Sequence, residues 1–373
     1  MTGDRRLGPW RLGANRVERF YRGGALLDAF RAGGLDPGPG AVDGTRPEDW
    51  LGSATRSWTP PGEDPTDEGL SRVDVDGRTR TIDELLAEDP ELVAGRDLVE
   101  RAGQPTLGVL VKLLDPAERL PVHAHPTRAF AREHLGSFFG KTEAWVILAT
   151  RSAADAPPPT LHLGFRRDVA PDELRTWIEE ERSDALLDAL HEVPARAGDA
   201  WLVPAGTPHA IGAGVFIAEV QEPTDFSIVA ESHGVPIDRE NATLRLGWDV
   251  SLDALTTRAL ADPELRALRY VPGPPPIAGA LPRARLLPNA ADPFFRAERW
   301  TVAGRSLPVD EASYLVGIVT RGEGRASVAH GGSLDLSVGS TFAVPAAGLS
   351  GLRIEGASLE LVACRPPKPD DLD

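Results

Sequence analysis

Two histidines in an extended segment, followed by a buried-strand pattern, most constrain how this chain can fold. His123 and His125 are two residues apart in the stretch Leu120-Pro-Val-His-Ala-His-Pro126. Alternate side chains of a strand leave the same face, so both imidazoles are expected to converge. Glu143 directly precedes the apolar run Ala144–Leu148, which is typical of a buried strand. Two strands joined by a loop would bring these three side chains together.

A fourth side chain of this kind follows another strand pattern. His209 comes after Trp201-Leu-Val-Pro and the turn Ala205-Gly-Thr-Pro. A lone histidine is usually a hydrogen-bonded core or loop residue, but imidazoles combined with a carboxylate suit zinc, iron, manganese or cobalt. The combination therefore predicts a divalent metal site with room for a substrate. The other histidines lack such a setting and are expected to be structural or exposed: His134, His162, His191, His233 and His330.

Three further ionisable residues lie in or beside apolar segments. Lys112 interrupts the aliphatic run Leu107–Leu114, and Glu219 interrupts the run from Val215 to Gln221. Burying a charge is costly, so each either faces a polar cavity or, for Lys112, points to water at a sheet edge. Lys141 is two residues before Glu143, where it is either a site residue or an exposed turn residue.

Periodicity divides the chain into β-rich and helical parts. Apolar residues recur at helical spacing in 165–192 and again in 251–270, while strand patterns dominate elsewhere. We expect a metal-binding β domain from residues 1–164 and 193–250, and a helical insertion from 165–192 and 251–270. A Pro-rich linker is expected at 271–294, and a smaller β domain, structural in role, at 295–373.

Composition and charge narrow the class of protein. The formal charge of −16 and the lack of a Lys/Arg block argue against nucleic-acid binding, although a small phosphorylated substrate needs only one or two local cations. No apolar run reaches the length of a membrane span, and the N-terminus lacks a signal-peptide core. The single cysteine, Cys364, excludes an intramolecular disulfide. These features predict a cytoplasmic protein, monomeric or homodimeric, that acts on a small molecule and not at a membrane.

The motifs resemble those of the type I phosphomannose isomerases, members of the cupin superfamily. The resemblance runs through residues 112–126, 140–145 and 204–210, covers approximately residues 10–250, and is weaker in the C-terminal part. It implies a mainly β fold. A cupin barrel (a double-stranded β-helix, or jelly roll) would be catalytic, with an inserted helical subdomain and a second, smaller cupin-like barrel at the C-terminus.

The resemblance also implies site residues. It implies one metal per chain, zinc first and iron, manganese or cobalt as alternatives, bound by His125, Glu143 and His209 with His123 completing the set. The family usually has Gln where this chain has His123, a change that bears on metal preference. The family also has a catalytic arginine after the strand that follows the last histidine. None stands at that position here, and Arg245 is the substitute we consider.

The leading functional hypothesis is a metal-dependent aldose–ketose isomerase that interconverts mannose 6-phosphate and fructose 6-phosphate through an enediol(ate). Glu219 is the predicted base, because burial raises the pKa of a carboxyl group, and Lys112 and Lys141 are predicted to serve the oxyanion or phosphate. The alternatives are an isomerase of an unphosphorylated or other sugar, a metal-dependent bicupin oxygenase, and a non-catalytic sugar-binding cupin.

Overall fold

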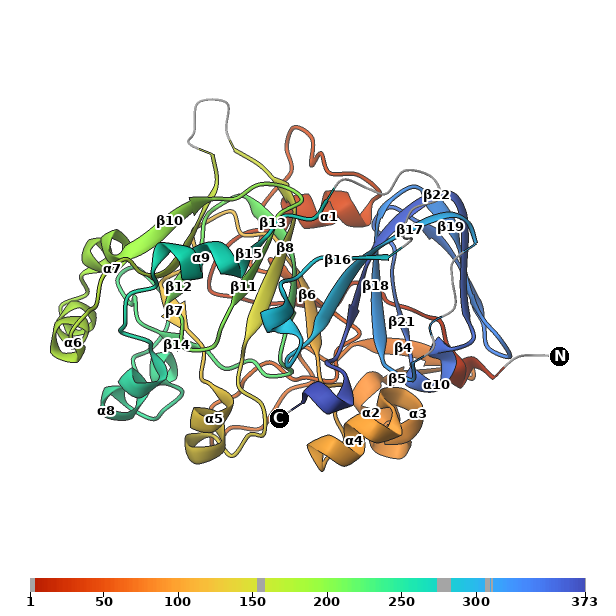
Figure 1. Cartoon of the computed structure of the whole chain (residues 1–373), viewed down its shortest axis with the longest axis horizontal. Coiled ribbons are helices and arrows are strands. Elements are labelled where there is room, and N and C mark those ends of the chain that lie inside the picture. Colours follow the sequence, from red (N-terminus) through yellow and green to blue (C-terminus); the bar gives the residue numbers. More distant parts are fainter. Residues whose placement is uncertain (1–3, 153–157, 274–282, 306–308, 310, 373) are drawn as a thin grey trace.

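The computed structural model of the chain describes residues 4–152, 158–273, 283–305, 309 and 311–372. Its strands form two β structures side by side, with the helices at their ends (Figure 1). This arrangement confirms the expected mainly β fold of the cupin type.

Two antiparallel sheets build the first barrel. The seven-stranded sheet has the order β15 (Arg269–Tyr270), β11 (Ala200–Val203), β8 (Glu143–Thr150), β13 (Val215–Gln221), β6 (Leu110–Leu114), β3 (Glu48–Leu51), β2 (Arg16–Val17). The five-stranded sheet has the order β10 (Leu190–Pro194), β9 (Thr160–Phe165), β12 (His209–Ile211), β7 (His123–Ala124), β14 (Ile228–Val229).

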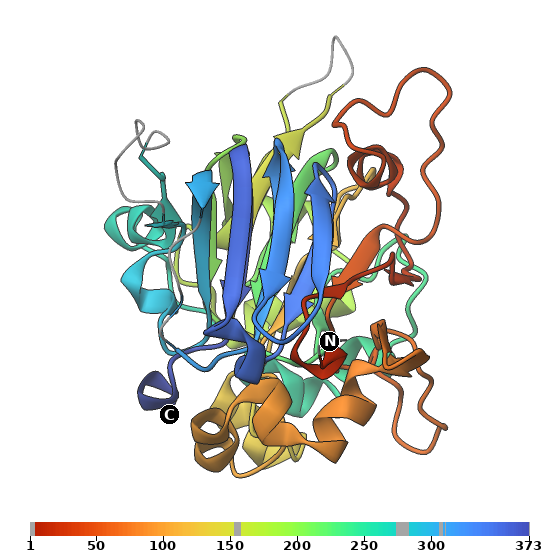
Figure 2. The ribbon, with the colours of Figure 1, turned by 90° about the vertical axis from the view of Figure 1, so that its right-hand side faces the viewer.

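A third sheet forms the C-terminal barrel, which faces the viewer in Figure 2. Its main path is β1 (Trp10–Arg11), β21 (Thr341–Val344), β18 (Leu315–Arg321), β22 (Leu352–Arg365), β17 (Arg296–Arg305), β16 (Arg283–Arg285). The strands β19 (Glu323–Val328) and β20 (Ser333–Ser337) branch from β22, and β4 (Arg72–Val75) pairs separately with β5 (Arg78–Thr81).

This sheet includes segments from outside residues 295–373. The N-terminal strand β1 pairs with β21, and β16 lies within the stretch expected to be a linker. Residues 274–282 of that stretch lie outside the described part of the chain.

The central strands of the first barrel explain why charged residues occur in apolar runs. Every residue of β13 is buried, as is every residue of β6. In the sheet Glu219 lies opposite Lys112 on one side and Trp145 on the other. Strands covered on both faces are almost continuously apolar, so the two charged side chains must compensate each other or face a polar cavity.

The helices surround the sheets. They are α1 (Ala25–Arg31), α2 (Ile82–Glu88), α3 (Pro90–Ala94), α4 (Arg96–Ala102), α5 (Arg128–His134), α6 (Pro171–Glu179), α7 (Ser183–Ala189), α8 (Trp248–Ser251), α9 (Asp262–Leu268) and α10 (Ala346–Leu349). Short 3₁₀ segments occur at Arg5–Leu7, Asn241–Thr243, Leu252–Ala254, Asn289–Ala291 and Pro369–Asp371.

The helices α6 and α7 lie within 165–192, and α8 and α9 lie within or beside 251–270. Leu174 and Ile178 of α6 share one apolar core with Leu186 of α7 and with Ala254 and Leu255. The helices α6, α7 and α8 lie at the end of the molecule away from the C-terminal sheet, whereas α2, α3 and α4 lie below that sheet (Figures 1 and 2).

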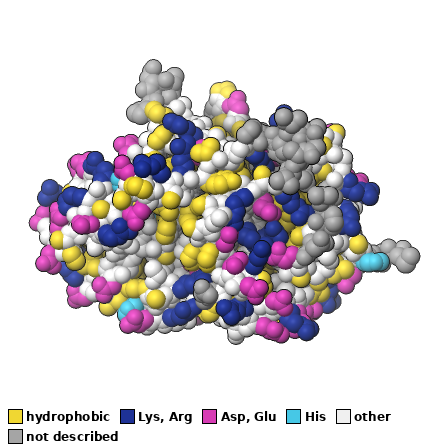
Figure 3. Space-filling view, in the orientation of Figure 1, with side chains coloured by type: hydrophobic (Ala, Val, Ile, Leu, Met, Phe, Trp, Pro, Cys, Tyr) yellow, Lys and Arg dark blue, Asp and Glu magenta, His cyan; other side chains and the backbone are white. Residues whose placement is uncertain are grey.

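Acidic and basic side chains are interspersed over the face of the molecule seen in Figure 3. In the part of the chain that the structure describes, none of the helices has the length and apolar character needed to cross a membrane.

Candidate active site and metal centre

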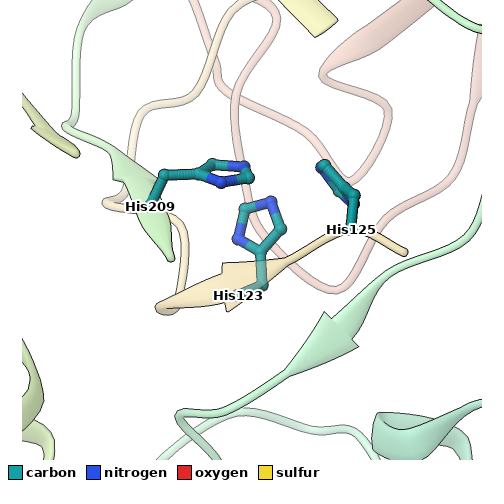
Figure 4. Close-up of side chains that lie close together, drawn as sticks. All are labelled: His123, His125 and His209. Atoms are coloured by element: carbon teal, nitrogen blue, oxygen red, sulfur yellow. The ribbon is translucent and has the colours of Figure 1, made fainter. Parts of the chain in front are cut away.

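Three histidines meet between neighbouring strands of the five-stranded sheet. His123 of β7 lies opposite His209 of β12, and His125 follows β7 directly (Figure 4). One ligand nitrogen from each ring lies within 4.8 Å of the other two. The spacing of His123 and His125 therefore presents both rings to one point, as predicted.

Each ring is held through its Nδ1 atom by a backbone carbonyl. Nδ1 lies 2.8 Å from Pro121 O in His123, 2.8 Å from Phe226 O in His125, and 2.8 Å from Thr207 O in His209. A carbonyl only accepts hydrogen bonds, so Nδ1 carries the proton and the Nε2 lone pair is directed to the centre of the cluster.

Burial keeps the imidazoles of His123 and His125 neutral. Burial, with a contribution from neighbouring His209, holds the pKa of His123 well below its usual value. Burial and then the Lys141 ammonium lower the pKa of His125 to about 3. Neutral imidazole is the form that binds metals, so the rings are ready to act as ligands at neutral pH.

Glu143, the first residue of β8, approaches the histidines from the seven-stranded sheet. Its Oε2 lies 3.0 Å from His125 Nε2, and its Oε1 lies 3.3 Å from His209 Nε2. Trp145 Nε1 donates a hydrogen bond of 3.0 Å to Oε1, which orients the carboxylate. Lys141 Nζ lies 3.0 Å from Glu143 Oε2 and 2.9 Å from His125 Nε2.

These four side chains fit a divalent metal. His209 Nε2 is buried without a hydrogen bond and faces a carboxylate oxygen, which is also an acceptor. Two acceptors that face each other in a buried site need a cation between them. Three imidazoles and one carboxylate suit zinc, iron, manganese or cobalt. The group of three histidines could therefore hold a metal, with Glu143 in position to join it.

A second cluster of charges lies beside the first. Lys112 Nζ lies 3.5 Å from Glu48 Oε2, 3.5 Å from Glu219 Oε1 and 3.8 Å from Asp225 Oδ1, and it faces the ring of Trp50. Lys112 is 2% exposed, so it does not point to water at a sheet edge. Although burial opposes its charge, these carboxylates raise the pKa of Lys112.

The two carboxylates beside Lys112 differ in character. Burial works against ionisation of Glu48, but Arg19 and Lys112 lower its pKa, and it accepts hydrogen bonds from Arg19, Tyr21 and Trp50. In Glu219, burial and then the nearby charge of Glu143 raise the pKa to about 7. The Oε1 atom of Glu219 has no hydrogen bond. One carboxylate is fixed as an anion, and the other can exchange a proton near neutral pH.

Both clusters open into one cavity of about 360 Å³, within the range of small-molecule sites. Its lining combines the metal-site residues, the charged cluster, an N-terminal segment and apolar groups. Among these are His123, Lys141, Glu143, Glu48, Lys112, Glu219, Asp225, Arg19, Phe20, Tyr21, Trp58, Val229, Ile237 and Leu244.

The structure therefore brings together seven of the eight candidate site residues and leaves Arg245 apart. Arg245 does not line this cavity; its Nη2 lies 3.2 Å from Glu63 Oε1, and its side chain is 37% exposed. The arginine that does line the cavity is Arg19, which sequence reasoning missed. Its Nη2 lies 3.3 Å from both carboxylate oxygens of Asp225, which lies 206 residues away in the sequence.

Comparisons with known proteins find relatives in sequence that are named as enzymes. The chain is 29% identical over 247 residues to the mannose-6-phosphate isomerase of Streptococcus mutans, covering 66% of this chain and 69% of the relative. No family model matches the chain.

Solved structures share the fold. The mannose 6-phosphate isomerase of Bacillus subtilis superposes with a TM-score of 0.69 at 22% identity, covering 95% of this chain and 99% of that one. A mannose 6-phosphate isomerase bound with zinc and yttrium gives a TM-score of 0.66 at 15% identity, covering 96% and 100%. The chain therefore has a relative in sequence among the mannose-6-phosphate isomerases and shares its fold with solved structures of such enzymes, and it is similar to this family.

Proposed function

We propose that the chain is a metal-dependent aldose–ketose isomerase that moves a proton between C1 and C2 of a hexose. The observation that carries the proposal is Glu219, a buried carboxylate that has one oxygen without a hydrogen bond and a pKa of about 7, and that lines the same cavity as the histidine cluster. A base with a pKa near the working pH is suited to proton transfer.

The metal would be held by His123, His125, His209 and Glu143. Zinc is the first expectation, since a structural neighbour is a zinc-bound mannose 6-phosphate isomerase and this donor set suits zinc. When bound, the metal supplies a Lewis acid that polarises the sugar carbonyl.

Glu219 carries the proton. Its carboxylate removes the proton from C2 of the open-chain aldose, and the C–H electron pair forms the C1–C2 double bond of an enediolate. The proton on O2 passes to O1, and Glu219 returns its proton to C1, which yields the ketose. The Lys141 ammonium, beside Glu143 and His125, would stabilise the developing oxyanion. Lys112 holds Glu219 in place and limits how far its pKa rises.

The mannose skeleton is the first to test, because relatives are named for mannose 6-phosphate. The experiment is NMR in deuterium oxide with metal-loaded protein, using mannose and fructose with and without 6-phosphate. We expect isomerisation with deuterium incorporation at C2 of the aldose, lost on treatment with a chelator and restored by zinc.

Metal analysis of variants separates binding from chemistry. His209→Ala should lose both the metal and activity, whereas His233→Ala, an exposed histidine outside the cluster, should keep both. Sugar binding without deuterium exchange would instead indicate a non-catalytic cupin, and oxygen uptake would indicate an oxygenase. Either result refutes the isomerase proposal.

A further inference from the structure

We infer that the sugar taken by this cavity is uncharged: the substrate class is a free hexose, not its 6-phosphate. This inference rests on the proposed function and specifies its substrate. The geometry that points to it is the pairing of every cation that lines the cavity with a carboxylate of the chain.

The two lysines lie at the end of the cavity that contains the histidine cluster and Glu219, the proposed base. Lys141 contacts Glu143 and His125 at the metal site, and Lys112 lies between Glu48, Glu219 and Asp225. A metal bound at the histidines would draw on Glu143, but Lys141 would still lie beside that centre. Neither ammonium is therefore placed for a phosphate at the opposite end of a six-carbon sugar.

Arg19 is the remaining cation of the lining, and two carboxylates hold it. Its Nε donates a hydrogen bond of 2.9 Å to Glu48 Oε1, and its Nη2 lies 3.3 Å from both oxygens of Asp225. Asp225 is held in turn by the backbone N–H of Trp58 at 3.0 Å. Binding a phosphate through Arg19 would weaken these contacts and leave Glu48 and Asp225 with fewer compensating partners in a buried site, which is costly.

The charge of the lining also disfavours a phosphate. Five carboxylates (Glu18, Glu48, Glu143, Glu219, Asp225) stand against three cations (Arg19, Lys112, Lys141), a formal excess of two negative charges. A divalent metal would bring this sum only to zero. A phosphomonoester adds a charge of about −2 at neutral pH, which such a lining does not attract.

Arg245, which lies near the cavity, is also paired with a carboxylate and is not free to bind a phosphate. Arg245 Nε lies 3.3 Å from Oδ1 of Asn241, a lining residue, but its Nη2 is paired with Glu63 at 3.2 Å. Within the described ranges 4–152 and 158–273, each cation that lines the cavity has a carboxylate partner.

What the cavity does offer matches hydroxyl groups. Glu219 Oε1 is an acceptor that has no hydrogen bond, and the hydroxyls of Ser57 and Ser227 also line the cavity. Acceptor-rich surfaces pair with the O–H donors of a polyol. Phe20, Tyr21 and Trp58 add aromatic surface of the kind that packs against the C–H faces of a sugar.

The test compares matched pairs of ligands on the metal-loaded full chain. Calorimetric titration with D-fructose and D-fructose 6-phosphate measures binding, and NMR with D-mannose and D-mannose 6-phosphate measures turnover. We expect kcat/KM for the free sugar to exceed that for the phosphate by about tenfold or more, with no tighter binding of the phosphate.

Tighter binding and faster turnover of the 6-phosphates would overturn the inference while leaving the isomerase proposal intact. Binding of free fructose without any deuterium exchange would refute the isomerase proposal and still support the ligand class.

A variant that removes one carboxylate tests whether the pairing of Arg19 causes the preference for an uncharged sugar. Asp225→Asn removes one partner of Arg19 and should shift the kcat/KM ratio toward the 6-phosphate by about tenfold, the scale of one well-placed charge. The matched control is Asp67→Asn, which removes an exposed carboxylate paired with Arg56 and Arg72 and should leave the ratio unchanged. An unchanged ratio in Asp225→Asn, or a selective loss of phosphate turnover in Arg245→Ala, would contradict the assignment.

Discussion

Glu48 and Glu219 both lie beside Lys112, but they differ in how readily they ionise. Glu48 accepts hydrogen bonds from Arg19, Tyr21 and Trp50, so its negative charge is compensated from three sides. Glu219 has an ion pair with Lys112 at 3.5 Å, and it is buried near the charge of Glu143. The difference in partners separates the pKa values of the two groups, which is how neighbouring acids acquire separate roles.

The pKa of Glu219 predicts that the proposed reaction is sensitive to pH. A base acts when it is ionised, so kcat/KM should fall as the pH drops below about 7 and reach a plateau above it. Glu219→Gln should lower kcat by a factor of about 10² to 10⁴ and retain the metal. The measurements are the pH profile of kcat/KM and the metal content of both proteins.

The control for this prediction is Glu323→Gln, which changes an exposed glutamate in the C-terminal sheet and should alter neither quantity. A pH profile without an acid limb near 7, or near-normal turnover in Glu219→Gln, would assign the base to another residue.

The raised pKa also means that folding favours the protonated form of Glu219. Its contribution to stability is therefore present below its usual pKa of 4.5 and is lost as the pH rises through about 7.

Residues whose role depends on local spacing could be predicted from the sequence. His123 and His125 alternate in an extended segment, and Glu219 and Lys112 are conspicuous because they interrupt apolar strands. Arg19 carries no such signal, because it lies in a polar segment and is held at the cavity by Glu48 and by Asp225, which is far away in the chain. Arg245 is the substitute considered for the family's arginine because it lies further along the chain after that strand, but position in the sequence does not determine where a side chain points.

At the scale of elements, α1 depends on a residue of a distant strand. Asp115, which follows β6, is fully buried, and its Oδ2 accepts hydrogen bonds from the backbone N–H groups of Gly24, Leu26 and Leu27 at 3.1, 2.7 and 3.1 Å. These are donors that the first turn of a helix cannot satisfy itself. Asp115 thereby fixes the chain just after Arg19 and Tyr21, which line the cavity.

Replacing Asp115 should therefore loosen α1. We expect Asp115→Ala to lower the free energy of unfolding by about 1–3 kcal/mol, because buried N–H groups lose their acceptor, and Asp115→Asn to cost less. Urea unfolding measures both. Asp188→Ala, an exposed carboxylate in α7, is the control and should have little effect. Equal stability of Asp115→Ala and wild type would show that water replaces the lost acceptor.

Element prediction from periodicity succeeded where amphipathic patterns are regular. The expected helical stretches contain α6, α7 and α9, and apolar residues at helical spacing are buried in α6 and α7. Pairing between strands that are far apart in the sequence is harder to predict. The strand β1, for example, is two residues long and joins the C-terminal sheet through β21. A strand this short has no period to detect, and its partner is more than 300 residues away.

At the scale of the whole molecule, the two barrels are joined through buried polar contacts as well as apolar packing. Arg31 donates to Asp49 of β3 at 2.6 and 2.8 Å and to Thr341 of β21 at 2.6 Å. Tyr314 donates a hydrogen bond of 2.9 Å to the carbonyl of Gly52. Gly52 has φ +58°, and a Cβ there would lie 2.5 Å from the Tyr314 hydroxyl. One apolar cluster includes residues of both barrels, among them Leu51, Val111, Val316 and Val362.

This shared core predicts that the barrels unfold together. Tyr314→Phe leaves the buried Gly52 carbonyl without its donor and should cost about 1–3 kcal/mol. Because the contact crosses the junction, hydrogen exchange should accelerate by the same factor in peptides from β13 of the first barrel and from β22 of the second. Tyr270→Phe, which alters a half-buried tyrosine of β15, is the control and should change exchange little. Acceleration confined to β22 would mean that the C-terminal barrel opens independently of the barrel that holds the active site.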